Sequence, residues 1–383
     1  MMVDRDEIVR VFKFAMLGQM LIRKFFFILE HEQERSMVAS SGIKGKPKPE
    51  EIEELFELED DLVEVDTELK EQIPFLGENE IKAVIGLQFQ SDRIALVGVG
   101  ARANGEGYST SDYNFLRSLG NLALLSIQKT ILLEERIEKE RMEEELNIAK
   151  SIQRGLLPDP IPEIDGIDLA ATNVSSYQVG GDYFDIAKTA DGNYLFAIGD
   201  VTGKGVPAAL LMANLQSMLH VLLPIDITLA DATNQINDII YENTPSDKFI
   251  TFFWGKFYHE DRTFRFVNAG HNPPIWLKAD SEEPDELKVG GLILGAMSTV
   301  TSYEEERVTL SSGDILVFYT DGVTEAQNPE QTEEYGEERL IECIKKNREA
   351  SSQKIQDAII EDISNFSDET QYDDITLIVI KMD

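Results

Sequence analysis

The sequence has almost none of the residues that build disulfide frameworks or soft-metal sites. Cys343 is its only cysteine among 383 residues, so a disulfide scaffold and a cysteine-ligated zinc site are both excluded. The four histidines are scattered along the chain, which excludes a histidine-rich metal site. A single cysteine fits a reducing compartment, and we therefore expect a soluble, cytoplasmic protein.

Basic residues and long apolar runs are also scarce. Thirty-five Lys and Arg residues oppose 71 Asp and Glu residues, which gives a formal net charge of −36. Such a charge repels phosphate backbones and anionic lipids, so we expect no nucleic-acid partner and no membrane partner. The most apolar stretches, 12–29 and 119–133, are interrupted by lysine or arginine. A phosphorylated substrate would be repelled too, unless bound cations reverse the field locally.

The first part of the chain has mixed helix and strand patterns. The aromatic run at 25–29 suits a strand, and two β-rich runs at 83–89 and 94–99 predict an antiparallel hairpin with its turn at 90–93. Residues 50–80 are strongly acidic and partly at helical spacing. We interpret that segment as a solvated face, part of it an acidic amphipathic helix, and assign it no chemistry.

A helical pattern without proline then runs to residue 157, and Ser109 or Ser111 is its predicted N-cap. Residues 133–145 are mostly charged, and a helix that is polar all round cannot be buried in a globular core. Apolar residues at heptad-compatible spacing favour pairing with a second copy. We predict a helical, coiled-coil linker at 125–157 between domains at 1–124 and 158–383. A homodimer through the linker is expected; the alternative is an exposed helix without a partner.

Beyond the prolines at 158, 160 and 162 the composition changes to short strands between Gly- and Asp-rich turns. Strands are predicted at 193–198, 251–254, 263–268, 314–318 and 374–380. Helices are predicted at 207–223, 230–242, 338–347 and 353–366. Clustered strands with grouped helices indicate an α+β fold with antiparallel sheets.

Aspartates recur in this region where strands meet turns. Asp182 follows Gly180-Gly181, Asp200 and Asp321 follow apolar runs and adjoin glycine, and Asp373-Asp374 precedes a strand. Carboxylates gathered at the ends of buried strands repel one another unless they share a cation. Oxygen ligands without His or Cys select hard cations such as magnesium or manganese.

Five motifs in order carry a family resemblance over about residues 150–383. They are Gly180-Gly181-Asp182, Gly199-Asp200-Val201-Thr202-Gly203-Lys204-Gly205, Asn268-Ala269-Gly270-His271-Asn272-Pro273-Pro274, Tyr319-Thr320-Asp321-Gly322 and Asp373-Asp374-Ile375-Thr376. The region resembles the SpoIIE/RsbU-type branch of PPM metal-dependent serine/threonine phosphatases. The resemblance implies an α-β-β-α sandwich of two antiparallel sheets, with two divalent metal ions, Mn²⁺ or Mg²⁺, at one end.

The resemblance also implies roles for individual residues. Asp200 would bridge both metals, with the Val201 carbonyl as a backbone ligand; Asp321 and Asp373 would complete one metal, and Asp182 would hold the other. Water activated by the two metals would then attack the phosphoryl group. Many PPM enzymes have a proton-donating His where Thr202 stands, so the general acid is unassigned. Weaker candidates, for supporting the ligands or for contacting substrate, are Asp185, Thr202, Gly203, Lys204, His271 and Asp374.

Residues 1–124 resemble a GAF sensory domain, through the hairpin, the glycine loop 105–107 and the helix that follows. The combined resemblances imply a phosphatase that acts on phosphoserine or phosphothreonine of a regulatory protein, expected to be a STAS anti-anti-sigma factor, under control of the sensor. The alternatives are a non-catalytic module that only binds a partner and a phosphohydrolase for small phosphoesters.

Overall fold

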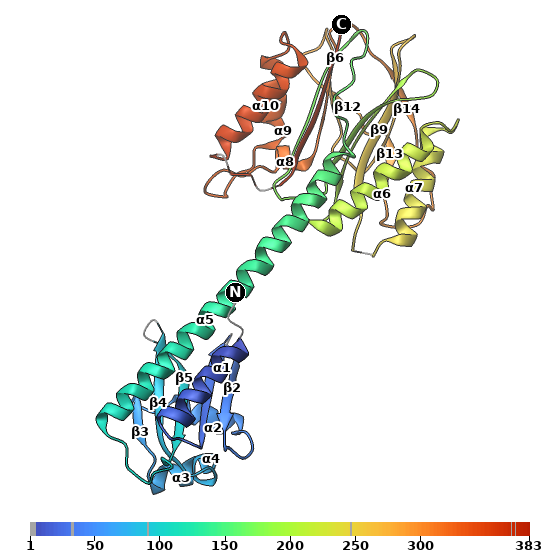
Figure 1. The fold of residues 1–383 in the computed structure, drawn as a ribbon. Coiled ribbons are helices and arrows are strands. Elements are labelled where there is room, and N and C mark those ends of the chain that lie inside the picture. Colours follow the sequence, from blue (N-terminus) through green and yellow to red (C-terminus); the bar gives the residue numbers. More distant parts are fainter. Residues whose placement is uncertain (1–4, 32–33, 90–91, 246, 369, 372) are drawn as a thin grey trace. The chain divides into compact units, whose positions relative to one another are not determined.

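The computed structural model describes residues 5–31, 34–89, 92–245, 247–368, 370–371 and 373–383. The chain divides into two compact units, Met1–Met142 and Glu143–Asp383. One continuous helix, α5 (Thr110–Arg154), contributes residues to both units (Figure 1). None of the helices in these ranges combines the length and apolarity that a membrane crossing requires.

The N-terminal unit is built on a five-stranded antiparallel sheet with the order β2-β1-β5-β4-β3. The strands are β1 (Phe25–His31), β2 (Glu34–Ser41), β3 (Leu62–Glu64), β4 (Ile81–Phe89) and β5 (Asp92–Gly100). One face is covered by α1 (Arg5–Phe14), a π-helical turn η1 (Ala15–Gln19) and the first part of α5. The other face is covered by α2 (Pro49–Phe56), α3 (Thr67–Gln72) and α4 (Pro74–Glu78).

Strand β1 shows why the aromatic run reads as a strand. Phe25 to Leu29 are all buried, because helices cover both faces of the sheet at this strand. The predicted hairpin corresponds to β4 and β5, and its predicted turn residues Gln90 and Ser91 lie outside the described residues. The acidic segment 50–80 is more than a solvated face, since its apolar residues Leu55 and Ile73 are fully buried against the sheet.

Helix α5 begins with a reciprocal cap. The Ser109 hydroxyl accepts the Asp112 N–H (3.2 Å), and Asp112 Oδ2 accepts the Ser109 N–H (2.8 Å), so Ser109 is the N-cap. The helix ends at Arg154, three residues before the predicted end at 157, because the chain turns at Gly155. Residues 132–145 are all exposed. The domain boundaries at 124/125 and 157/158 and pairing with a second copy stay predictions.

The C-terminal unit packs two sheets between two pairs of helices. The first sheet has the order β13-β10-β9-β8-β7, with β14 also on β10; the second has the order β12-β11-β15-β16-β6. Every strand pair is antiparallel except β10 with β13. The first sheet's strands are β7 (Tyr183–Lys188), β8 (Tyr194–Val201), β9 (Ile250–Tyr258), β10 (Thr263–Ala269), β13 (Gly290–Gly291) and β14 (Glu306–Thr309). The second sheet's strands are β6 (Ile167–Val174), β11 (Ile275–Leu277), β12 (Asp285–Glu286), β15 (Ile315–Tyr319) and β16 (Ile375–Met382).

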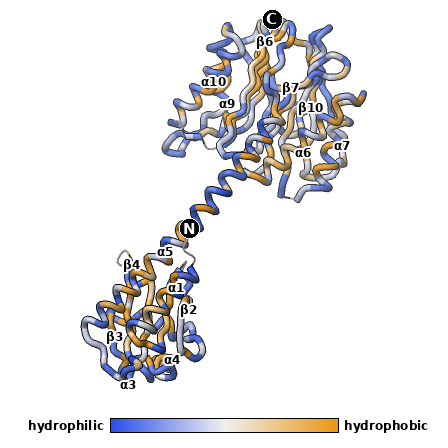
Figure 2. The backbone as a smooth tube through the Cα atoms, viewed as in Figure 1, coloured by the Kyte–Doolittle hydropathy of each residue, from blue (hydrophilic) through white to orange (hydrophobic). Residues whose placement is uncertain are grey.

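Three apolar layers hold this unit together. Helices α6 (Val206–Leu222) and α7 (Leu229–Asn243) pack on the first sheet, and α9 (Gly336–Lys346) and α10 (Ser352–Phe366) pack on the second. A short helix, α8 (Asp321–Thr324), follows β15. The sheets meet through aromatic rings, with Phe318 at 5.2 Å from Phe253 between ring centroids. Figure 2 shows the apolar residues concentrated along the strands. The predicted α-β-β-α sandwich is confirmed.

Replacing the ring that joins the two sheets should destabilise the C-terminal unit strongly. Phe318 is fully buried, so Phe318→Ala should lower the free energy of unfolding by about 3–5 kcal/mol. Urea denaturation followed by tryptophan fluorescence measures this, because both tryptophans, Trp254 and Trp276, lie in that unit. The control Val300→Ala, at a side chain that is 82% exposed, should change the value by less than about 0.5 kcal/mol. Equal effects of the two substitutions would contradict the description of the core.

Candidate metal centre

Aspartates from both sheets lie at strand ends in the C-terminal unit. From the first sheet, Asp182 directly precedes β7, and Asp200 lies near the end of β8. From the second sheet, Asp321 follows β15 after one residue. Asp373 and Asp374 directly precede β16, which pairs with β15. Facing sheets thus supply the acidic residues of the predicted site.

Hydroxyl groups of the second sheet hold Asp182. Its Oδ2 accepts a hydrogen bond from Thr320 Oγ1 (2.8 Å) and another from Thr376 Oγ1 (2.6 Å). Thr320 follows β15 and Thr376 lies in β16, so the bonds cross from one sheet to the other. Asp182 is only 4% exposed, and a carboxylate at that depth requires such partners.

Burial and mutual repulsion raise the pKa values of these carboxyl groups. Burial raises the pKa of Asp200 to about 7, with further contributions from the charges of Asp321 and Asp373, while a hydrogen bond with Asp182 opposes the shift. Burial, and then the charge of Asp200, raises the pKa of Asp182 well above its usual value. Burial and Asp373 also raise the pKa of Asp321. These oxygen donors, close enough to disfavour each other's charge, fit a hard divalent cation.

The turn that carries Asp182 is packed against Asp374 and Val201. Asp374 Oδ1 accepts hydrogen bonds from the Ser176 N–H (2.7 Å) and hydroxyl (2.9 Å), and its Oδ2 accepts the Gly181 N–H (3.0 Å). A Cβ on Gly181 would lie 2.7 Å from the Val201 carbonyl oxygen and 3.5 Å from Asp200 Oδ1. The Val201 carbonyl and the Asp200 carboxylate therefore face the same glycine, where a side chain has no room.

Asp373 is engaged with a lysine. Lys204 Nζ lies 2.9 Å from Asp373 Oδ2 and 5.7 Å from the ring centre of Tyr177. In the described part of the chain, no group of three or more His, Cys, Asp or Glu side chains is arranged to hold a metal ion. Asp373 faces Lys204, and Asp182 faces two threonines.

His271 connects the two sheets next to the carboxylates. Its Nε2 donates to the Tyr319 carbonyl (3.1 Å), so its Nδ1 accepts the Thr251 hydroxyl (2.9 Å). Thr251 pairs with Asp200 across β8 and β9, and Tyr319 ends β15. Burial lowers the pKa of His271 to about 4, so the ring is neutral at pH 7 and cannot supply a proton as an imidazolium.

Asp185 contacts α6 and not the other carboxylates. Its Oδ2 accepts the Tyr183 hydroxyl (2.7 Å) and lies 2.7 Å from His220 Nε2 of that helix. Thr202 and Gly203, two of the weaker candidates, lie in the loop after Asp200. The Thr202 hydroxyl accepts the Phe249 N–H (3.1 Å). Gly203 has a φ of +90°, which favours glycine.

The C-terminal part of the chain matches a known protein family. The model of the family "Stage II sporulation protein E (SpoIIE)" matches residues 190–383, half of the chain. The chain belongs to the SpoIIE family. It is 29% identical over 245 residues to phosphoserine phosphatase RsbU of Bacillus subtilis, covering 63% of this chain and 71% of RsbU. It is 28% identical over 263 residues to protein IcfG of Synechocystis, covering 62% of this chain and 41% of IcfG.

Solved structures agree on the fold of this SpoIIE-family unit. The SiaA-PP2C domain of Pseudomonas aeruginosa aligns with a TM-score of 0.56 and 21% identity, over 64% of this chain and 99% of that one. The PP2C phosphatase domain of SpoIIE from Bacillus subtilis aligns with a TM-score of 0.50 and 21% identity, over 57% of this chain and 62% of that one. The SpoIIE-family chain is a PP2C-type, metal-dependent protein phosphatase. The GAF-like assignment of residues 1–124 stays a prediction.

Sequence reasoning missed the partners of Asp182 in this SpoIIE-family unit. The motifs contain Thr320 and Thr376 without indicating a role for them, although both hydroxyls bond Asp182. A usable signal was available, because each threonine stands within three residues of a predicted ligand, Asp321 or Asp373. Which way the two hydroxyls point depends on how the sheets face each other, and no local pattern contains that information.

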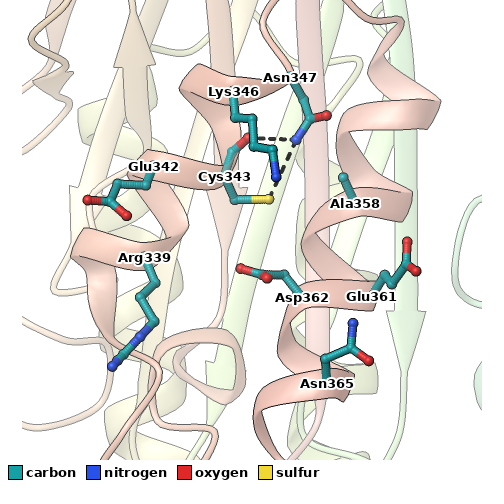
Figure 3. A pocket seen from close by; sticks show the side chains of 9 residues that line it. All are labelled: Arg339, Glu342, Cys343, Lys346, Asn347, Ala358, Glu361, Asp362 and Asn365. Carbon is teal, nitrogen blue, oxygen red and sulfur yellow. Dashed lines mark hydrogen bonds between the residues drawn. The ribbon is translucent and has the colours of Figure 1, made fainter.

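A cavity of about 580 Å³ between α9 and α10 lies outside this set of residues (Figure 3). It is lined by side chains of both charges and by the single cysteine of the SpoIIE-family chain: Arg339, Glu342, Cys343, Lys346, Asn347, Ala358, Glu361, Asp362 and Asn365. Cys343 is 8% exposed, as expected for a helix core residue, and burial raises the pKa of its thiol. A raised pKa disfavours the thiolate, so the cavity offers no activated nucleophile.

The raised pKa of Asp200 predicts how one substitution depends on pH in chelated protein. The folded state keeps Asp200 protonated up to about pH 7, whereas the unfolded chain loses that proton near its ordinary value of 3.8. The folded state therefore loses stability as pH rises from about 4 to about 7. Asp200→Asn removes this loss, so it should raise the free energy of unfolding more at pH 7.5 than at pH 5. Urea denaturation with excess chelator measures both values.

The matched control is Asp280→Asn, at an exposed aspartate outside the site, measured at the same two pH values. An Asp200→Asn effect of equal size at both pH values would show that Asp200 is not a repelled, buried carboxyl group.

Proposed function

We propose that this chain hydrolyses phosphoserine or phosphothreonine on a regulatory protein, with two divalent cations, Mn²⁺ or Mg²⁺, as cofactors. The cations would be held by oxygen donors alone, namely Asp182, Asp200, Val201 (carbonyl), Asp321 and Asp373. The observation that carries the proposal is that acidic side chains of both sheets lie together at strand ends, where they repel one another: Asp182 bonds to Thr320 and Thr376 of the other sheet, and Asp200 and the Val201 carbonyl face the glycine beside Asp182. Divalent cations remove that repulsion, and oxygen donors select the hard ones.

Bound cations supply a nucleophilic water and neutralise charge on the phosphoryl group. The chain's own residues orient the ligands: Thr320 and Thr376 hold Asp182, and Asp374 holds the backbone of Gly181. Lys204, 42% exposed, can exchange Asp373 for the phosphate of the substrate, because both groups are anions that accept from its ammonium.

A protein substrate is supported by two observations. The relative RsbU is named a phosphoserine phosphatase. Tyr177 and Asp373 are 56% and 43% exposed, so a phosphorylated side chain on a large partner can reach this part of the site. We propose a STAS-domain anti-anti-sigma factor as that partner and the cytoplasm as the location.

We further propose that residues 1–124 act as a GAF-like sensor and that α5 transmits its state, in a homodimer paired through the linker. The continuity of α5 from Thr110 to Arg154 supports a mechanical connection. Its exposed apolar residues, among them Leu125, Leu132 and Met142, support pairing at heptad-compatible positions.

The test is phosphate release from a phosphorylated STAS protein and from a small aryl phosphate, with and without Mn²⁺. Release from the protein should require Mn²⁺, and Asp200→Ala or Asp321→Ala should lower the rate by more than about 100-fold, because each removes a charged ligand. Asp280→Ala, at an exposed aspartate, is the matched control and should retain activity.

Three outcomes distinguish the alternatives. Release from the aryl phosphate alone would favour a phosphohydrolase for small esters. Tight binding of the phosphorylated partner without release would favour a non-catalytic module. Activity that survives both aspartate substitutions would refute the assignment of the site.

A further inference from the structure

A lysine that precedes β9 lies against the loop that follows Asp200. Lys248 stands two residues before the strand begins, and a Cβ on Gly203 would be 2.9 Å from its Nζ. Gly203 is the third residue after Asp200 in the sequence. Because the end of β8 pairs with the start of β9, the Lys248 ammonium lies at the same strand ends as the acidic residues of the predicted site.

The backbone beside this contact is fixed on both sides. The Thr202 N–H donates to the Phe249 carbonyl (3.1 Å), and the Phe249 N–H donates to the Thr202 hydroxyl (3.1 Å). On the other side, the Lys248 N–H donates to the Pro245 carbonyl (2.9 Å). The segment that carries Lys248 is therefore tied to the residue next to Gly203, and the lysine side chain starts from a defined point.

The ion pair of Lys248 is weak. Its Nζ lies 4.0 Å from Asp247 Oδ2, and the Asp247 side chain is 75% exposed, so water screens the attraction. The Lys248 side chain is 28% exposed, so a bound substrate can reach it. The ammonium can therefore donate a proton without first breaking a strong ion pair.

The proposed reaction needs a proton at the oxygen that leaves phosphorus. A serine or threonine oxygen that departs as an alkoxide is a strong base. A donor that protonates this oxygen while the bond breaks lowers the barrier, and a lysine ammonium can serve as such a donor.

Other polar side chains at these strand ends are already engaged. The neutral ring of His271 uses both of its nitrogens, and Thr202 donates its hydroxyl proton to the Phe249 carbonyl (3.1 Å). Lys204 faces Asp373, which it exchanges for the substrate phosphate in the proposed function. Lys248 thus combines a proton to donate with a place beside the loop after Asp200.

We propose that Lys248 donates the proton to the leaving oxygen of the phosphorylated serine or threonine. Water attacks phosphorus and releases a proton to solvent, the bond from phosphorus to the side-chain oxygen breaks, and Lys248 protonates that oxygen. The amine then regains a proton from solvent, so one water yields one alcohol and one inorganic phosphate. Lys248 touches the reacting oxygen in this step and is therefore a catalytic residue. The inference rests on the proposed function, because it concerns the same reaction.

The first test separates proton donation from charge. Lys248→Arg keeps a positive charge on a group that cannot give up its proton, and Lys248→Met removes both the charge and the proton. Each should lower kcat for phosphate release from the phosphorylated STAS protein, at saturating Mn²⁺, by about 100-fold or more, the usual effect of losing a general acid. The matched control is Lys256→Met, farther along β9 in an ion pair with Asp191 (2.7 Å), which should keep the wild-type kcat.

The second test changes the leaving oxygen. The nitrophenolate of para-nitrophenyl phosphate is a weak base that leaves without a proton, so both Lys248 variants should hydrolyse this ester within about 3-fold of the wild-type rate. Their Mn²⁺ affinity, measured by isothermal titration calorimetry, should equal that of wild type, because Lys248 is not a ligand. Equal unfolding midpoints in excess chelator establish that the variants are folded. If one variant fails to fold, the other carries the measurement.

The outcomes separate this inference from the proposed function. Wild-type kcat on the phosphorylated protein in either Lys248 variant would overturn proton donation and leave the metal site standing. An equal loss on both substrates, or weaker Mn²⁺ binding, would also overturn it, because neither effect depends on the leaving oxygen. If wild type does not hydrolyse the aryl ester, kcat on the protein and the Mn²⁺ affinity decide. Asp200→Ala with wild-type activity would refute the metal site itself.

Discussion

Repulsion between carboxylates that share a poorly solvated space is the constraint around which the C-terminal unit is built. The charge of Asp200 raises the pKa of Asp182, and the charges of Asp321 and Asp373 raise the pKa of Asp200. A fold can keep such groups together only if their surroundings hold them more strongly than they repel. The hydroxyls of Thr320 and Thr376 serve this purpose for Asp182, and the apolar layers keep the two sheets from separating.

The predicted site is shared between two sheets, because each sheet contributes carboxylates from the ends of its strands. His271 then joins the sheets next to those ends, through Thr251 on one side and the Tyr319 carbonyl on the other. Its neutral ring adds no charge to a crowded region. The aromatic packing between the sheets and the polar contacts at their ends thus support one arrangement.

Local patterns predicted five strands of the C-terminal unit (β8, β9, β10, β15 and β16) and its four longer helices, because each of these depends on residues close in sequence, whereas β6, β7, β11 and β14 were not predicted. The run before Asp200 is apolar, and α6, α7, α9 and α10 follow helical periodicity. Short strands such as β12 and β13 carry no such pattern, since the neighbouring strand determines them. Asp185 shows the other limit: its motif suggested a place among the carboxylates, whereas its hydrogen bonds lead to Tyr183 and His220.

Local sequence patterns do not predict contacts between segments that are distant in the sequence. The sequence pattern of the linker helix gives Gln153 no role, and its contact with Gly180 depends on how the end of α5 lies against the turn that carries Asp182. The acidic segment 50–80 looks like a solvated stretch because its charged residues outnumber the few apolar ones that pack. In both cases the residues that make the contact are more than 20 positions apart in the sequence.

The unbroken course of α5 has a consequence for how such chains can change over time. A helix of 45 residues is about 68 Å long, and every residue added to it or removed from it turns everything beyond that point by about 100° about the axis. Inserting or deleting a residue in the exposed stretch would therefore change the rotation about the helix axis by a large angle, but the length of the helix by only about 1.5 Å. Lineages that exchange or lengthen the segment are expected to do so in steps of seven, which nearly restore the original orientation.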